Sequence, residues 1–200
     1  MKSTTAIIIS LLAIILLWGG CSYNKMVKTG EGTSAKWADV ESEYQRRSDL
    51  IPNLGAVVKN YADFEKSTLE AVISARAKAT STEIKVDANN LNEDQIAKFQ
   101  QAQDNLSGAL NRLLVTVERY PDLKANQNFL ALQTQLEGTE NRIKVARNNF
   151  NEAVQSYNTY IKTFPQNIFA RLFGFQPKGY FKSQAGSESA PDVKDLFKDK

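Results

Sequence analysis

The chain of 200 residues contains no histidine. This absence excludes histidine-based acid and base catalysis, Ser-His and Cys-His nucleophiles, and the zinc and di-iron sites that need imidazole ligands. A site built only from carboxylate, lysine or tyrosine side chains remains open in principle. We therefore expect a protein that is not an enzyme and that uses neither a metal ion nor another cofactor.

The chain also has very little cysteine, and neither sign of charge is in large excess. Cys21 is the single cysteine, so an intramolecular disulfide is excluded. The net charge is +3, and basic residues alternate with acidic ones without forming a basic stripe, so we expect no nucleic-acid partner. No stretch matches a phosphate-binding loop or a dinucleotide fingerprint. The length accommodates one domain of ordinary size.

One long apolar run is present, AIIISLLAIILLWGG at residues 6–20. With its uncharged neighbours it reaches about 20 residues, or about 30 Å as a helix, which is enough to span a bilayer. A cleaved signal peptide is the alternative, with Lys2 as the positive region and residues 7–17 as the apolar region. Residues 1–22 are thus predicted to be a transmembrane or signal segment, and residues 23–34 a juxtamembrane spacer.

Cys21 lies directly after this run and is a possible lipidation site. Gly19 and Gly20 supply the pair of small residues that precedes an acylated cysteine, but Trp18 occupies a position where lipoprotein signals usually have an aliphatic residue. Three interpretations stay open: an uncleaved span, acylation at Cys21, and plain cleavage. The first two both predict a membrane-tethered protein.

The orientation of the protein in the membrane depends on which of these three interpretations of the N-terminal segment holds. Lys2 precedes the apolar run, whereas Lys25, Lys28 and Lys36 follow it. By the positive-inside rule this distribution favours a single-pass protein whose C-terminal domain is cytoplasmic. Acylation at Cys21 would instead place that domain outside the cytoplasm.

The rest of the chain has helical periodicity. Apolar residues at three- and four-residue spacing predict helices over residues 35–47, 50–79, 92–119 and 126–163. Ser48, Asp49 and Pro52 predict a break or sharp kink between the first two helices, and Asn92 with Gln95 forms a capping box before the third. Because each helix has one apolar face to bury, we expect an all-α, antiparallel up-and-down bundle of about four helices, preceded by the N-terminal membrane-anchoring helix.

The bundle domain is expected to include residues 35–181 and to end in an aromatic segment, residues 164–181. That segment either folds back over one end of the bundle or forms an exposed patch for a partner or the membrane interface. Trp37 and Tyr44 are predicted to be core residues. Residues 182–200 are small, polar and charged, and we expect a disordered tail.

Charged residues gather at two places, the predicted break and the middle of the fourth helix. One interpretation is a polar patch that binds a ligand or partner, and the other is a set of ion pairs that fixes the helix register. The candidate residues are Arg46, Arg47, Asp49, Glu137, Glu140 and Arg147.

Several strings in order along the chain resemble the LemA family of bacterial membrane-associated proteins. They are YNKMV after the apolar run, QRRSDLIPNL at 45–54, VERYPDLKANQNFLALQTQLEGTENRI at 117–143, ARNNFNEAVQSYN at 146–158 and FPQNIFARLFGF at 164–175. The resemblance implies a helical bundle after one transmembrane segment, with a short outside N-terminus and a large cytoplasmic domain. It implies no established catalytic activity. Cys21, just before SYN, is not part of the family's motif.

These observations lead to two functional hypotheses. The first is a membrane-anchored helical bundle that acts as a non-catalytic scaffold or adaptor through contacts with a protein partner. The alternative is a surface or periplasmic lipoprotein, acylated at Cys21, that binds a small ligand or an envelope partner. The sequence leaves the partner's identity and the oligomeric state open.

Overall fold

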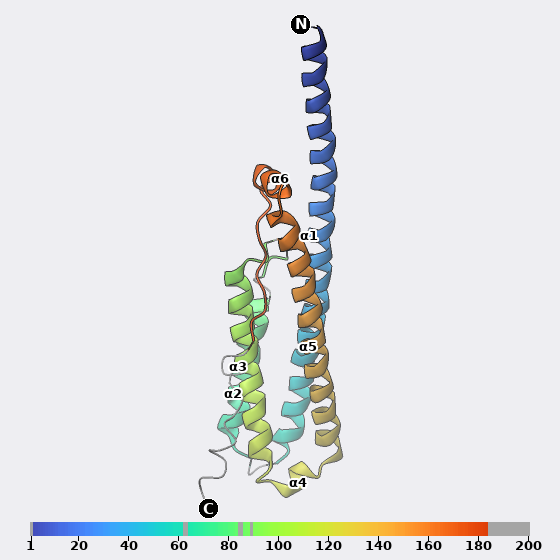
Figure 1. Cartoon of the computed structure of the whole chain (residues 1–200). Coiled ribbons are helices and arrows are strands. Elements are labelled where there is room, and N and C mark those ends of the chain that lie inside the picture. The colour runs from blue at the N-terminus through green and yellow to red at the C-terminus, as the bar shows by residue number, and fades with distance from the viewer. Residues whose placement is uncertain (1, 62–63, 84–85, 89, 184–200) are drawn as a thin grey trace, which may run out of the picture.

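The computed structural model describes residues 2–61, 64–83, 86–88 and 90–183. All regular secondary structure in these residues is helical, which confirms the predicted all-α class. The four long helices alternate in direction along one axis, and two short helices lie near opposite ends of the bundle (Figure 1). In chain order the helices are α1 (Lys2–Lys59), α2 (Lys66–Glu83), α3 (Glu93–Val117), α4 (Pro121–Lys124), α5 (Gln127–Lys162) and α6 (Gln166–Phe173).

The first helix is longer than the sequence predicts. α1 comprises 58 residues, and at the helical rise it is about 87 Å long. The expected start near residue 35 is therefore wrong, because residues 23–34 are helical as well. In this stretch Thr33 is buried, and a ring carbon of Tyr157 in α5 lies 3.6 Å from where a Cβ on Gly30 would be. Packing against α5 thus outweighs the low helix propensity of Gly30 and Gly32.

A break or a sharp kink was predicted around residues 48–52, and the break is wrong because α1 continues through them. Pro52 lies inside α1, where it has no N–H to donate to the carbonyl of Ser48 one turn earlier. Arg76 of α2 replaces the missing donor, because its Nε donates to the Ser48 carbonyl oxygen at 2.8 Å. A side chain from a neighbouring helix thereby satisfies the acceptor that the proline leaves free.

The helix expected over residues 50–79 is two helices in the structure. α1 ends at Lys59 and α2 begins at Lys66. Between them the Tyr61 N–H donates to the Val58 carbonyl at 3.1 Å, and Phe64 packs in the core with its ring 5.1 Å from that of Tyr120. This turn reverses the chain, so α2 packs antiparallel to the end of α1.

The predictions for the third and fourth long helices agree closely with α3 and α5. Asn92 caps α3, since its Oδ1 accepts the Gln95 N–H at 2.9 Å. The reciprocal bond of a capping box is absent, because the Asn92 N–H donates to the Asn90 carbonyl at 2.8 Å instead. Asn126 caps α5, which ends at Lys162 shortly before Pro165.

The middle of the core is aromatic. The indole of Trp37 lies edge-on to Phe99 at 5.0 Å and to Phe150 at 5.4 Å, and it stacks on Phe181 at 5.9 Å. Tyr44 lies edge-on to Phe99 at 5.0 Å. Trp37 and Tyr44 are both buried, as predicted for core residues.

The chain after α6 returns along the bundle as an extended segment, residues 174–183, which we call the C-terminal strap (Figure 1). Three amide side chains of α3 and α5 each donate one hydrogen bond to its backbone and accept another. They thereby satisfy strap N–H and carbonyl groups that have no helical partner. The pairs, at 2.8–3.0 Å, are Asn158 with Lys178, Asn151 with Phe181, and Gln100 with Lys182.

The aromatic segment combines both arrangements that the sequence left open. Phe181 is buried in the centre of the bundle, whereas Phe164 and Phe173 are exposed near α6. Lys182 is held by Gln100, so the expected tail does not begin at residue 182. The rest of the predicted disordered tail, from residue 184, lies outside the described residues.

None of the helices, as far as their residues are described, combines the length and apolarity that crossing a membrane requires. The structure therefore gives the predicted membrane-spanning helix no support. That prediction rests on residues 6–20, where the side chains of residues 6, 8, 11–12 and 15–16 lie outside the described part of the chain.

Candidate functional site

The charged residues predicted as one polar patch do not lie together in the structure. They are found in three different environments. Arg46 and Asp49 are exposed on α1, and Asp49 accepts a hydrogen bond from Gln45 at 2.7 Å. Glu137 is exposed on α5 and accepts one from Gln133 at 3.0 Å. These three charged side chains lie on the surface, outside the network formed by Arg47 and Glu140.

Arg147 contacts the C-terminal strap. Its Nη2 donates to the Lys182 carbonyl at 3.0 Å, and its guanidinium carbon lies 4.7 Å from the centre of the Phe181 ring. It therefore covers the outer side of Phe181 and contributes to fixing the strap.

Arg47 and Glu140 do come together, across the interface of α1 and α5. The Arg47 side chain is 1% exposed, and its Nη1 donates to Glu140 Oε1 at 2.6 Å. The same guanidinium donates to the Ser107 hydroxyl at 2.7 Å and to Gln103 Oε1 at 2.6 Å, both on α3. One cation thus links three helices, while its Nε has no partner among the described residues.

Gln103 and Ser107 were not among the residues predicted from the sequence. Gln103 occupies a buried position on the apolar face of α3, between Phe99 and Leu106. A polar residue in an otherwise apolar helical stripe was the available signal, since a buried amide needs a hydrogen-bonding partner.

A half-buried carboxylate lies at the end of α2. Burial, with repulsion from Glu41 and Asp49, raises the pKa of Glu83 to about 7, against a smaller opposing effect of Arg47. Burial likewise raises the pKa of Glu41. Within the described residues no three His, Cys, Asp or Glu side chains are grouped so that they could hold a metal ion.

A cleft of about 340 Å³ lies between α1, the loop before α3 and the start of the strap. Met26, Ser34, Tyr157 and Phe175 are among its lining residues, together with Lys178. Burial lowers the pKa of Lys178, while Glu31 and Asp87 act in the opposite direction. The cleft combines apolar walls with one half-buried amine, a combination suited to a small amphipathic ligand.

The most distinctive surface is the end of the bundle where α6 meets α1. We call it the apical patch, and its side chains are large, apolar and exposed. Scattered exposed apolar residues are ordinary, but a contiguous group marks a surface that contacts a partner or a membrane. The residues of the apical patch are Tyr23 of α1, Phe164 in the turn before α6, and Ile168, Leu172 and Phe173 of α6.

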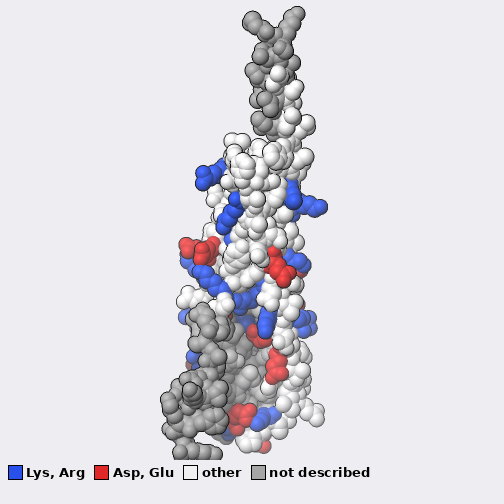
Figure 2. Space-filling view, viewed as in Figure 1, with Lys and Arg blue, Asp and Glu red and all other residues white. Residues whose placement is uncertain are grey.

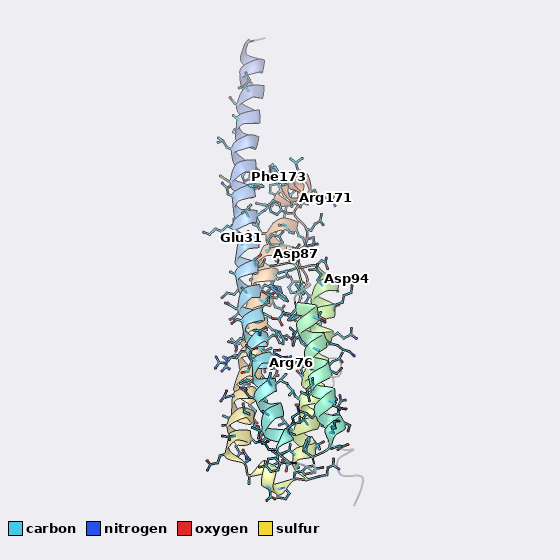
Figure 3. The ribbon with its side chains drawn as sticks, turned by 180° about the vertical axis from the view of Figure 1, so that it is seen from behind. Glu31, Arg76, Asp87, Asp94, Arg171 and Phe173 are labelled. Atoms are coloured by element: carbon cyan, nitrogen blue, oxygen red, sulfur yellow. The ribbon has the colours of Figure 1, made fainter. Side chains whose placement is uncertain are left out.

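α6 is held at this end by aromatic contacts with α1. A Cβ added to Gly19 would lie 3.1 Å from a ring carbon of Phe169, so α6 approaches α1 closely at this glycine. The ring of Tyr23 lies edge-on to Phe173 at 5.1 Å and to Phe175 at 5.7 Å. Figure 3 shows Phe173 beside α1 at this end. Cys21, within the same part of α1, is exposed.

Comparisons with known proteins identify the family to which the sequence is related. The family model described as the LemA family matches residues 36–194. The chain is 25% identical to magnetosome protein MamQ 2 of Paramagnetospirillum magneticum, over 96% of this chain and 75% of that protein. It is 26% identical to magnetosome protein MamQ of Magnetospirillum gryphiswaldense, over 88% of this chain and 71% of the relative.

A relative that bears the family's name is also similar. Protein LemA of Metamycoplasma hominis is 30% identical over 155 residues, which cover 78% of this chain and 66% of the relative. The family match includes the Arg47–Glu140 pair, α6 and the strap, and thus most of the bundle. The chain belongs to the LemA family.

Proposed function

We propose that this protein is a membrane-anchored scaffold or adaptor that acts through protein contacts and catalyses no reaction. The observation that supports it most directly is the exposed apolar surface on the N-terminal part of α1. This part of the helix extends beyond the bundle (Figure 1). Ile7, Ile9, Ile14 and Leu17 are all exposed there, within the apolar run at residues 6–20. Such a surface is stable only when lipid or protein covers it.

The anchor and the bundle belong to one continuous helix. α1 passes from the apolar run into the core, where Trp37, Val40 and Tyr44 are buried. A continuous helix transmits position and orientation, whereas a flexible linker would leave the bundle free to reorient. The bundle is therefore held at a defined distance and angle from the membrane, as a scaffold requires.

The bundle lies on the cytoplasmic side in this proposal. Lys25 and Lys28 follow the apolar run, and the fold brings Arg171 of α6 to the same end of the molecule. Lys2 is the single basic residue before the run. The basic residues near the proposed membrane surface are thus concentrated on the bundle's side.

Protein contact is the proposed activity because the chemistry of the described site supports binding better than catalysis. Histidine is absent, and the buried cation Arg47 is engaged with three neighbouring side chains. Val115 of α3 and Val145 of α5 are exposed on the sides of the bundle, so a partner that packs against either side would contact one of them.

Site-specific photocrosslinking tests the scaffold proposal. A photoreactive residue is placed at Val115 or Val145 in the full chain, and membranes are irradiated under native conditions. We expect one of the two positions to give a discrete adduct with a defined protein. The position that gives no adduct is then the matched control, because it is a valine exposed on another helix. Absence of adducts at both positions and at Leu130, the exposed apolar residue of the first turns of α5, would contradict the proposal.

The lipoprotein alternative retains one structural argument. Cys21 is exposed, so its thiol is accessible to an acylating enzyme, and the cleft that contains Lys178 could hold a small ligand. In that case residues 1–20 are removed, and Phe169 loses its contact with Gly19. The intact mass of the membrane-extracted protein separates the two proposals, because acylation at Cys21 requires a mature chain that starts there.

A further inference from the structure

α6 has an outer apolar stripe that no part of the described chain covers. Phe164 lies in the turn before α6, and Ile168 and Leu172, four residues apart within the helix, lie on one side of it. Their exposed fractions are 75%, 56% and 73%. In a helix that only closed the end of the bundle, this side would be polar.

The opposite side of α6 already has its partners. Ala170 is buried, Phe169 contacts Gly19, and Phe173 lies against Tyr23. The helix is therefore apolar on two sides, and the packing of the bundle accounts for only one of them. The outer stripe is therefore available to contact an apolar environment outside the bundle.

The position of α6 matches that of a membrane surface. It packs on α1 at Gly19 and Tyr23, where the apolar run at residues 6–20 ends. In Figure 1, α6 is seen nearly end-on, whereas α1 and α5 are seen lengthwise. α6 thus lies across the axis of α1, and it lies in the membrane plane if α1 enters the bilayer along the normal.

The charges around this end complement an anionic surface. Residues 1–30 and 153–183 contain no Asp or Glu. Figure 2 shows basic side chains closest to the apolar end, with acidic side chains only farther along the bundle. Interfacial helices on anionic lipids combine an apolar face with such flanking cations. Of the cations in these segments, Lys25 and Lys28 follow the apolar run on α1, Lys162 ends α5 shortly before α6, and Arg171 lies in α6.

From this geometry we infer that α6 is a second membrane contact, which inserts Phe164, Ile168 and Leu172 into the interface of an anionic bilayer. This inference rests on the proposed membrane anchor and adds the orientation of the bundle to it. α1 sets the distance from the membrane, and α6 prevents the bundle from rotating or tilting about the anchor. Trp18 and Tyr23 lie at the same level, where aromatic side chains favour the lipid headgroup region.

The test measures the depth of single spin labels on the full chain. Cys21→Ser removes the native thiol, and Leu172→Cys or Ile168→Cys introduces the label on the outer stripe. Val115→Cys on α3 is the matched control, since Val115 is 72% exposed and Leu172 is 73% exposed. The labelled chains are reconstituted in vesicles of phosphatidylcholine and phosphatidylglycerol, and collision rates with oxygen and with a water-soluble nickel complex are recorded.

We expect labels at Leu172 and Ile168 to collide with the nickel complex at least about threefold less often than the label at Val115, and more often with oxygen. Equal nickel accessibility at all three positions, with the chain still in the vesicles, would overturn the role of α6 and leave the anchor intact. Dipolar broadening between labels at Leu172 that persists on lipid dilution would show that a second copy of the chain covers the outer stripe. That result would also overturn the inference. A chain that does not remain in the vesicles would overturn both the anchor and the inference.

Discussion

Arg47 and Glu140 form the ion pair that joins α1 to α5, with 2.6 Å between Nη1 and Oε1. The two ends of the pair differ in environment, because the Arg47 side chain is 1% exposed and that of Glu140 is 45% exposed. The cation is thus inside the bundle and its counter-ion is at the surface. This arrangement supports the interpretation that the pair sets the helix register.

Replacing Arg47 should therefore cost more stability than replacing its neighbour. Arg47→Ala leaves Gln103 and Ser107 without their donor inside the bundle, and we expect a loss of about 3 kcal/mol in the free energy of unfolding. Arg46→Ala, at an exposed position, should change it by less than about 0.5 kcal/mol. Urea unfolding followed by circular dichroism provides the comparison, and equal effects of the two substitutions would argue against the register role.

Phe181 is expected to be the energetic centre of the strap. Phe181→Ala removes a ring packed against Trp37, Phe99 and Phe150, and we expect it to lower the free energy of unfolding by about 3–4 kcal/mol. Tyr180→Ala, beside it but exposed, should cost less than about 1 kcal/mol. If the two variants unfold at the same urea concentration, the strap does not contribute to the core as described.

Two glycines should respond to alanine in opposite ways. A Cβ on Gly179 would lie 2.6 Å from the Cα of Glu93, so Gly179→Ala must displace the strap from the start of α3. A Cβ on Gly108, inside α3, meets nothing within 4 Å, and Gly108→Ala should stabilise the protein by about 0.5–1 kcal/mol.

Hydrogen exchange reports the difference between these glycine variants. In Gly179→Ala, the strap amides of Lys178, Phe181 and Lys182 should exchange about tenfold faster, because their side-chain acceptors no longer hold them. In Gly108→Ala their exchange should be unchanged or slower. Unchanged strap exchange in Gly179→Ala would mean that the strap is not held at this contact.

Stability should depend on pH through Glu83. Its pKa is about 7 in the folded protein and 4.5 ordinarily, so the folded state holds the proton more tightly than the unfolded state. Glu83 therefore reduces stability progressively as the pH rises from about 4.5 to about 7. Because the side chain is only half buried, solvent screening limits the effect to about 1 kcal/mol.

Glu83→Gln isolates this contribution. The variant should be more stable than the native chain at pH 8 by about 1 kcal/mol and equally stable at pH 4. Glu152→Gln, at an exposed position of α5, controls for the loss of one surface charge. A stabilisation of Glu83→Gln that is the same at both pH values would show that protonation of Glu83 is not the cause.

The sequence predicted those features that depend on neighbours along the chain. The apolar stripes of α3 and α5 and the cap at Asn92 are local, and the structure agrees with them. The break predicted at Pro52 failed because its compensating donor, Arg76, comes from another helix. The strap was missed in part because Asn151 and Asn158 bind backbone groups that lie far away in the sequence.

In the candidate site, too, local features could be predicted from the sequence, whereas contacts between distant residues could not. Arg47 and Glu140 were both among the candidate residues, but their pairing was not predicted, and the burial of Arg47 depends on its contacts with Gln103 and Ser107 of α3. The outer stripe of α6 is readable as apolar residues, yet its significance depends on the contact between Phe169 and Gly19. That contact places α6 beside the apolar end of α1.

Alkaline extraction of native membranes, followed by intact-mass measurement of the extracted and retained protein, tests the membrane-anchored account most directly. The account predicts that the chain stays in the membrane pellet and that its mass includes the apolar run at residues 6–20. Recovery of the chain in the supernatant would contradict the anchor. A retained chain that begins at Cys21 and carries acyl groups would contradict the continuous membrane-inserted α1 and establish the lipoprotein instead.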